Sequence, residues 1–276
     1  MKKDNYYDFA DEAPYSNDDK IEVITDYRRG YRMKKVIVKQ DYNYNKKGTY
    51  YSFEIDEIDN KEVSDKKIEL IKNNLIEMMK ELKIKKNPHV LMVGLGNDEF
   101  SSDAFGPQTI KNINANSYLS DVNSKVSCLI PGVMKTTGLE SAMIIKSLVD
   151  KFKFDLVVVF DSLTTKNINR LFKVIQITDT EIIPGAGIKN FRKSLNSTYL
   201  GVPLIAVGVS MAICYSSIIE DVLTHIDGVL KVNKENKKYL LNNLNSHLVL
   251  TGKDSEIKVK CISKNVAKIF NSIFTK

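Results

Sequence analysis

From residue 89 onward, short uninterrupted apolar segments alternate with helical segments, and this pattern limits the folds that the chain can adopt. The apolar segments are 89–94, 126–130, 156–160, 172–178 and 204–209. Continuous apolar strands of this kind are buried on both faces, as in a parallel sheet between two layers of helices. Helices are expected near 104–114, 138–152, 213–230 and 263–274. The sequence therefore predicts an α/β fold with a mostly parallel sheet flanked by helices on both faces.

The first third of the chain has a different pattern. Residues 33–40 and 49–55 are expected to form a small β-hairpin, and 65–82 has apolar residues at helical spacing. The first twenty residues hold six acidic residues and three lysines, against a net charge of +7 for the whole chain. We therefore divide the chain into an acidic leader, residues 1–26, and a single α/β domain, residues 27–276. The leader is either a disordered tail or a segment that docks on the basic body and is later removed.

Composition narrows the classes of protein to consider. No stretch of apolar residues is long enough to span a membrane, and the first residues lack the apolar segment of a secretory signal. Three cysteines lie far apart in the sequence, which favours a reducing compartment such as the cytoplasm over a disulfide framework. The basic residues are spread among acidic ones, which is typical of a solvated surface. We therefore expect neither a membrane nor a nucleic-acid partner.

Two aspartates stand where functional groups gather in α/β folds, at the carboxyl ends of strands. Asp161 directly follows the segment 156–160, and Asp103 lies in the loop after 89–94. Two carboxyl groups held close together cannot both ionise easily, so one can activate water while the other donates a proton. The alternatives are structural: Asp103 as a helix N-cap and Asp161 as a turn residue at a strand end.

Three glycine-containing loops accompany these aspartates. Gly94-Leu95-Gly96-Asn97 lacks the third glycine of a dinucleotide-binding loop and is interpreted as a tight turn. The other two loops are 131–134 and 184–187, the second followed by basic residues. We assign the rim of the site to Asn97, Pro131, Gly132, Met134, Gly185, Gly187 and Arg192. The three histidines lack the spacing of metal ligands, so neither a metal nor another cofactor is expected.

Taken in order, five blocks resemble the germination proteases of spore-forming bacteria. They are VGLGNDEFSSDAFGP (93–107), IPGVMKTTGLE (130–140), FDSLTTKNINR (160–170), VIQITDTEIIPGAGIKNFRKSLN (174–196) and LGVPLIAVGV (200–209). The resemblance implies a fold like that of phosphorylases and hydrogenase maturation proteases. It also implies that Asp103 and Asp161 match the two essential aspartates of an atypical acid endopeptidase without a cofactor.

The same resemblance implies a biological setting. Germination proteases cut small acid-soluble spore proteins in the spore core during germination, and they are homotetramers. They are made as zymogens that lose an N-terminal propeptide. The tetrapeptide Ile24-Thr25-Asp26-Tyr27 is similar to the family's processing site, which places the cut between Asp26 and Tyr27.

Two departures from the family pattern keep other hypotheses open. Ile183 stands where the family usually has histidine, and 210–214 differ from the segment that follows the last family strand. One alternative is a metal-sensing protease of the hydrogenase-maturation type, in which Asp103 and Asp161 hold a divalent ion. Another is a divergent paralogue that binds spore proteins without cutting them.

Overall fold

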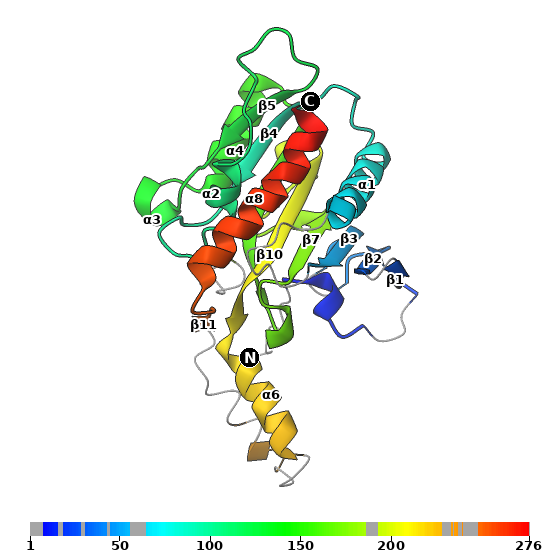
Figure 1. Ribbon diagram of the computed structural model, residues 1–276, viewed down its shortest axis with the longest axis vertical. Helices are drawn as coiled ribbons and strands as arrows, with labels where there is room; N and C mark the ends of the chain where they lie inside the picture. Colours follow the sequence, from blue (N-terminus) through cyan, green and yellow to red (C-terminus); the bar gives the residue numbers. More distant parts are fainter. Residues whose placement is uncertain are drawn as a thin grey trace.

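The computed structural model describes residues 8–15, 19–28, 31–42, 45–55, 65–185, 193–227, 233, 235, 236, 239 and 248–275. Within these residues one mixed sheet of nine strands forms the centre of the molecule, with helices on both faces (Figure 1). Across the sheet the order is β1 (Ile21–Arg28), β2 (Tyr31–Val38), β3 (Gly48–Glu54), β7 (Val174–Thr178), β10 (Leu204–Cys214), β6 (Leu156–Thr165), β4 (His89–Gly94) and β5 (Lys125–Leu129). The ninth strand, β11 (Val249–Leu250), pairs with the end of β10.

The core of the sheet is parallel. β10, β6, β4 and β5 run in the same direction, and their registers place Val90 opposite Leu156 and Leu204 opposite Val157. Successive residues of these strands point to opposite faces of the sheet, and both faces are covered, which is why the segments read as continuous apolar runs. The predicted α/β class, with a sheet that is parallel in its core and flanked by helices, is confirmed.

The other half of the sheet is antiparallel. The predicted hairpin is present as β2 and β3, and it continues the main sheet because β3 pairs with β7. A further strand, β1, was not expected from the sequence; it lies largely within the proposed leader and pairs with β2 along its whole length. Two short strands, β8 (Glu181–Ile182) and β9 (Leu195–Asn196), form a separate ladder beside the main sheet.

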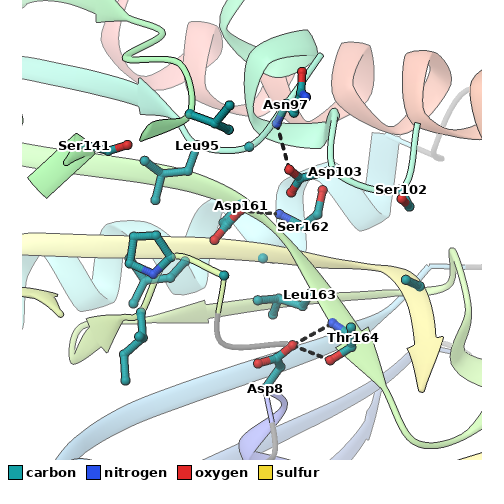
Figure 2. Close-up of a pocket in the computed structure, with 18 of the residues that line it drawn as sticks. Asp8, Leu95, Asn97, Ser102, Asp103, Ser141, Asp161, Ser162, Leu163 and Thr164 are labelled. Carbon is teal, nitrogen blue, oxygen red and sulfur yellow. Dashed lines mark hydrogen bonds between the residues drawn. The ribbon is translucent and has the colours of Figure 1, made fainter. Parts of the chain in front are cut away.

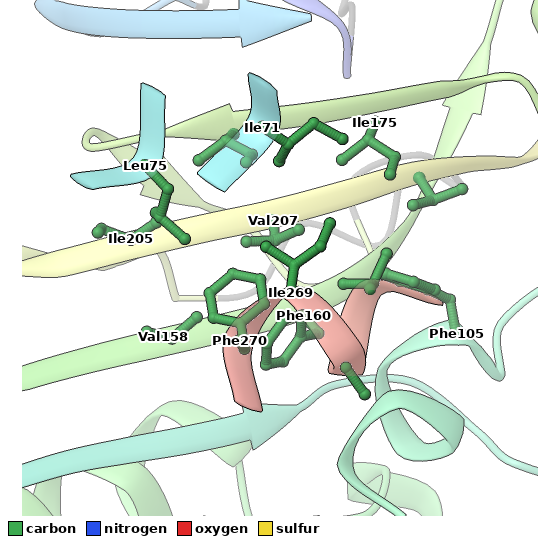
Figure 3. Close-up of a cluster of buried hydrophobic side chains, with 14 of the residues drawn as sticks. Ile71, Leu75, Phe105, Val158, Phe160, Ile175, Ile205, Val207, Ile269 and Phe270 are labelled. Atoms are coloured by element: carbon green, nitrogen blue, oxygen red, sulfur yellow. The ribbon is translucent and has the colours of Figure 1, made fainter. Parts of the chain in front are cut away.

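Two helical layers bury the two faces of the sheet. The helices are α1 (Asp65–Glu81), α2 (Phe105–Ile110), α3 (Met134–Thr137), α4 (Ser141–Phe152), α5 (Ser197–Leu200), α6 (Tyr215–Asp227) and α8 (Ser255–Phe274). On one face α1, α2 and α8 pack against β4, β6, β7 and β10, and Figure 3 shows Phe160 of β6 beside Phe270 of α8. These two rings meet edge to face, with centroids 4.9 Å apart. On the other face, α4 and α5 cover the alternate residues of β4, β6 and β10.

Several helix boundaries differ from those predicted, for local reasons. The helix expected at 138–152 begins at Ser141 as α4, because Gly138 adopts a left-handed conformation (φ 71°) and ends a separate short helix, α3, that was not expected. The last helix begins at Ser255 rather than at residue 263. Its first turns are rich in charged residues, yet Val259 and Ile262 continue the buried stripe of the later turns. In the described part of the chain, no helix is both long enough and apolar enough to cross a membrane.

Candidate active site

A cavity of about 400 Å³ opens beside the carboxyl end of β4, between β6, β10 and the loops that follow β4, β5 and β7. Figure 2 shows the side chains that line it. The polar residues among them are Asp8, Asn97, Ser102, Asp103, Lys135, Ser141, Asp161, Ser162, Thr164, Gln176, Thr178 and Glu181. The two aspartates singled out in the sequence therefore lie in one cavity, as expected.

The cavity exists because neighbouring strands have different lengths. β4 ends at Gly94, which pairs with Phe160, whereas β6 continues to Thr165 alongside β10. Asp161 is the first residue of β6 beyond the end of β4, so it borders the space where β4 is missing. The sequence analysis placed Asp161 at the end of its strand; it lies within β6, at the end of the neighbouring strand instead.

Asp103 is held by the loop between β4 and α2. The backbone N–H of Asn97 donates to Asp103 Oδ2 at 2.8 Å, and the N–H of Asp103 donates to the carbonyl of Phe100 at 2.8 Å. The N-cap residue of α2 is Ala104, so the alternative interpretation of Asp103 as that helix cap is wrong. Its carboxyl group is instead directed into the cavity beside Asp161 (Figure 2).

Close backbone approach fixes this loop. Gly96 has φ 109°, and a Cβ atom at this position would lie 2.0 Å from the carbonyl oxygen of Asp103 and 3.0 Å from its Oδ1. Only glycine fits there without displacing Asp103. The interpretation of the glycine pair as a tight turn therefore has a direct connection to the site.

Asp161 is nearly inaccessible to water, with 6% of its surface exposed. Its Oδ1 accepts a hydrogen bond from the backbone N–H of Ser162 at 2.9 Å. Burial, followed by the negative charges of Asp103 and Asp8, raises the pKa of Asp161 well above the usual 3.8. A carboxyl group in this environment retains its proton at pH values where an exposed aspartate is ionised.

Asp8 is a third carboxyl group in the cavity, and the sequence analysis did not single it out. It belongs to the leader, and its Oδ2 accepts hydrogen bonds from the backbone N–H of Thr164 at 2.7 Å and from the hydroxyl of Thr164 at 2.5 Å. Figure 2 shows Asp8 beside Thr164, further along β6 than Asp161. The only feature of the sequence that pointed to this contact is the excess of acidic residues in the leader. Docking of the leader on the basic body was one of the two interpretations of that excess.

The buried environment of Asp8 also bears on how pH affects docking. Burial raises the pKa of Asp8 to about 6, so the docked leader favours the protonated form of this residue. Burial likewise raises the pKa of Glu12. Mild acidification therefore strengthens the contacts that Asp8 and Glu12 make with the body rather than weakening them.

The remaining predicted residues have different outcomes. Asn97, Gly132 and Gly185 line the cavity, whereas Pro131 and Met134 do not; Val133 and Lys135 line it in their place. Gly187 and Arg192 lie outside the described residues. The predicted processing position, Asp26 and Tyr27, lies in β1, away from the residues that line the cavity.

No group of three or more His, Cys, Asp or Glu side chains among the described residues is arranged to hold a metal ion. Ile183, which stands in place of the family histidine, lines the cavity. Cys128 is half-buried in β5, and burial raises its pKa to about 11, which does not favour a reactive thiolate.

Comparisons with known proteins point to one family. A model of the germination protease family matches residues 3–267. The germination protease of Caldanaerobacter subterraneus subsp. tengcongensis is 34% identical over 72% of this chain and 69% of its own length. The germination proteases of Geobacillus sp. (strain WCH70) and Bacillus subtilis (strain 168) are 37% and 32% identical over 67% and 70% of this chain. The chain spans about half the length of these last two relatives, 52% and 56%.

One solved structure is also similar. The crystal structure of a NiFe hydrogenase maturation protease, HycI from Thermococcus kodakarensis KOD1, shares 15% sequence identity and aligns with 70% of this chain and 99% of that chain. The TM-score of 0.34 is too low to bear on function.

The contact between Gly96 and Asp103 leads to a prediction about stability. We expect Gly96→Ala to lower the free energy of unfolding by about 2–5 kcal/mol, because the methyl group adds a clash to an unfavourable left-handed backbone. Gly201→Ala is the matched control, since Gly201 has φ 77° and open space around it. It should cost only about 1–2 kcal/mol. Urea denaturation of both variants measures the difference, and equal costs would contradict the proposed close contact.

The burial of Asp161 leads to a prediction about pH. Because its pKa is raised in the folded state, ionisation of Asp161 destabilises the fold as pH rises above 3.8. Asp161→Asn should therefore match the wild type in strongly acidic solution and become more stable than it at higher pH, by up to about 1.4 kcal/mol per pH unit. Thermal unfolding across pH measures this trend.

Asp155 provides a control of opposite sign. Burial opposes its ionisation, but bonds from Lys85 and from the backbone N–H of His89 outweigh this and lower the pKa of Asp155. Asp155→Asn should therefore match the wild type in strongly acidic solution and become less stable than the wild type as the pH rises to about 3.8 and above. Parallel pH profiles for the two variants would refute the ionisation assigned to Asp161.

Proposed function

The chain belongs to the germination protease family, and on this premise we propose that it is an endopeptidase whose chemistry rests on Asp103 and Asp161. The family is one of peptidases, which supports the class of reaction. The observation that carries the residue assignment is that both carboxyl groups line one cavity, where the charge of Asp103 helps to raise the pKa of Asp161. Such a pair holds one proton between two carboxyl groups, as acid–base catalysis by two aspartates requires.

In the proposed reaction, the buried Asp161 is the protonated member. Asp103 accepts a proton from a water molecule as the water oxygen attacks the carbonyl carbon of the scissile peptide bond. Asp161 donates its proton to the carbonyl oxygen, which gives a tetrahedral intermediate. As the C–N bond then breaks, the proton held by Asp103 passes to the leaving amine nitrogen and Asp161 takes back a hydroxyl proton, so both residues return to their starting forms. The burial that raises the pKa of Asp161 supports this division of roles, and the hydrogen bond from the N–H of Asn97 keeps the carboxylate of Asp103 in place.

The proposed substrate and setting are those that the family resemblance implies. We propose that the protein cuts small acid-soluble spore proteins during germination, acts in the cytoplasm of the spore core and works as a homotetramer. The net charge of +7 suits acidic substrates. A direct nucleic-acid or membrane partner forms no part of the proposal.

The two departures from the family pattern have different surroundings. Ile183 contributes to the cavity wall, so it bears on substrate preference. Ser210 lies within β10, where its hydroxyl donates to the carbonyl of Arg170 at 2.5 Å and accepts from the N–H of Val174 at 3.3 Å. Its role there is to join β10 to the segment before β7. Neither departure favours a metal-sensing or purely binding function over the endopeptidase.

The catalytic assignment predicts the effect of removing either carboxylate. Asp103→Asn and Asp161→Asn should each reduce cleavage of a small acid-soluble spore protein by about 10²–10⁴-fold or more, because the two residues act as a unit. Asp98→Asn is the matched control, since Asp98 lies in the same loop but pairs with Lys111 and Gln108 outside the cavity. It should leave cleavage nearly unchanged.

Two further arms make this experiment decisive. Circular dichroism of each variant checks the fold, so that near-normal cleavage by a natively folded Asp103→Asn or Asp161→Asn protein would sink the assignment. The wild type is also assayed in EDTA, where activity should persist. Loss of activity that zinc or nickel restores would support the metal-dependent alternative instead.

The leader is proposed to be an inhibitory propeptide that is cut after Asp26. Incubation of the full-length protein should produce a new N-terminus at Tyr27, detected by mass spectrometry, and Asp161→Asn should stay intact under the same conditions. Because the docked form favours protonated Asp8, release should be faster near pH 7 than near pH 5. A wild-type chain that cuts substrate while its leader remains attached would show that the leader does not inhibit.

A further inference from the structure

Beyond Asp8, the leader continues into a second polar site that the proposed reaction does not use. The backbone carbonyl of Asp8 accepts from the side-chain amide of Gln176 at 2.9 Å, and the amide oxygen of Gln176 accepts from the N–H of Ala10 at 2.8 Å. Phe9, between them, is fully buried against Leu163 and Val174. The segment 8–12, whose residues Ala10–Glu12 form a single turn of 3-10 helix, thus lies along β6 and β7 from the aspartate cavity onward.

Arg170 holds the far end of this segment. Its two Nη atoms donate to the two carboxylate oxygens of Asp11 at 2.9 and 2.8 Å, and its Nε lies 3.3 Å from Glu12 Oε1. The guanidinium carbon lies 5.0 Å from the centre of the Phe9 ring. The side chain of Arg170 is 14% exposed, and those of Asp11 and Glu12 are 3% and 7% exposed. Paired, planar recognition of a carboxylate in a nearly dry site is the strong form of this interaction.

Other parts of the body complete the site around the same two acids. Lys34 of β2 lies 3.4 Å from Asp11, whose Oδ1 also accepts from the hydroxyl of Ser52 at 3.0 Å. Glu12 accepts from the hydroxyl of Thr165 and from the backbone N–H of Lys166, the latter at 2.9 Å. We call Arg170, Lys34, Ser52, Thr165 and the N–H of Lys166 the Arg170 site. Four separate segments contribute only donors and positive charge to it.

Among the described residues, the carboxylates that pair with Arg170 are Asp11 and Glu12, both in the leader. Phe9, Asp11 and Glu12 of the leader lie against Arg170, so departure of the leader would remove both carboxylate partners and make the guanidinium accessible to another anion. The position of the site is also fixed relative to the cavity, because Asp8 binds Thr164 and Glu12 binds the next residue of β6, Thr165.

We propose that the Arg170 site is a specificity-determining subsite that binds paired acidic side chains of the peptide substrate. A substrate that follows the path of the leader would place one residue in the aspartate cavity and its acidic pair three and four residues further towards the carboxyl terminus. The leader and the substrate therefore compete for the same positive site. This inference rests on the proposed endopeptidase function for its biological meaning, but the binding itself can be tested separately.

The binding test uses two synthetic peptides with a fluorescent label. One has the sequence of residues 8–15, and the other carries Asp11→Asn and Glu12→Gln in that sequence. The protein is the full chain with Asp161→Asn, to prevent cleavage, and with the same two leader substitutions, to weaken its own occupant. Fluorescence anisotropy should show at least about 10-fold tighter binding of the acidic peptide, as expected when charge-assisted hydrogen bonds are lost. Equal affinities for the two peptides would overturn the proposal, and this first test needs no substitution of Arg170.

Variants of the protein assign the discrimination to Arg170. Arg170→Gln in the same background should bind both peptides with the affinity of the neutral one. Arg32→Gln is the matched control, because Arg32 pairs with Glu54 at 3.2 Å and does not line the cavity. It should preserve the preference for the acidic peptide. A folded Arg170→Gln protein that still prefers the acidic peptide would refute the role of this residue.

Cleavage by the protein with both catalytic aspartates intact separates the two proposals. A cleavable peptide with the acidic pair should have a lower KM than its neutral counterpart at similar kcat, and Asp11→Asn with Glu12→Gln in the leader should raise kcat/KM for the acidic peptide. Discrimination in binding without any cleavage would refute the endopeptidase and leave the subsite standing. Cleavage of both peptides with the same KM would refute the subsite and leave the endopeptidase standing.

Discussion

The buried carboxyl group of Asp161 is the feature on which the rest of the site depends. The five residues before it in β6 are fully buried on both faces of the sheet, so the strand cannot slip to bring Asp161 into water. A carboxyl group held in such a place either stays protonated or needs a positive partner. The neighbours that most affect its ionisation are themselves carboxyl groups, Asp103 and Asp8. The packing of the sheet therefore favours the protonated form of Asp161.

Close contact between β4 and α2 gives the second carboxyl group its position. A Cβ atom at Gly94 would lie 2.4 Å from the carbonyl oxygen of Gly106, and one at Gly106 would lie 2.2 Å from that of Leu95. These contacts bring the start of α2 against the end of β4, so the loop between them must fold back on itself. Asp103 stands at the end of that loop and is directed into the space that β4 leaves open. Gly94 and Gly106 thus allow the close approach that places Asp103 at the cavity.

The parts of this arrangement that were predictable from the sequence are those encoded locally. Continuous apolar runs predicted the strands β4, β6 and β10. The aspartates at or near the ends of these runs predicted the place of the cavity, because parallel strands bring their carboxyl ends to one edge of the sheet. The contacts of the leader were not predictable, since Asp8 and Thr164 are 156 residues apart. β1 was missed because Val23 and Ile24, among its apolar residues, are 48% and 41% exposed in a charged surrounding, which hides the pattern of a strand. The cavity is lined by Val133 and Lys135 rather than by Met134. This depends on the turn at α3, which the spacing of residues in the sequence does not reveal.

The position of β1 has a consequence for assembly. It forms the outer edge of the sheet and pairs with β2 from Ile21 opposite Val38 to Arg28 opposite Tyr31. A cut after Asp26 would release most of this strand and turn β2 into the edge, with a row of unpaired backbone donors and acceptors. Such an edge attracts strands from other chains unless charged side chains discourage them, and β2 carries Arg32, Lys34 and Lys35. Removal of the leader would therefore change the sheet edge that is available for contacts between copies of the molecule.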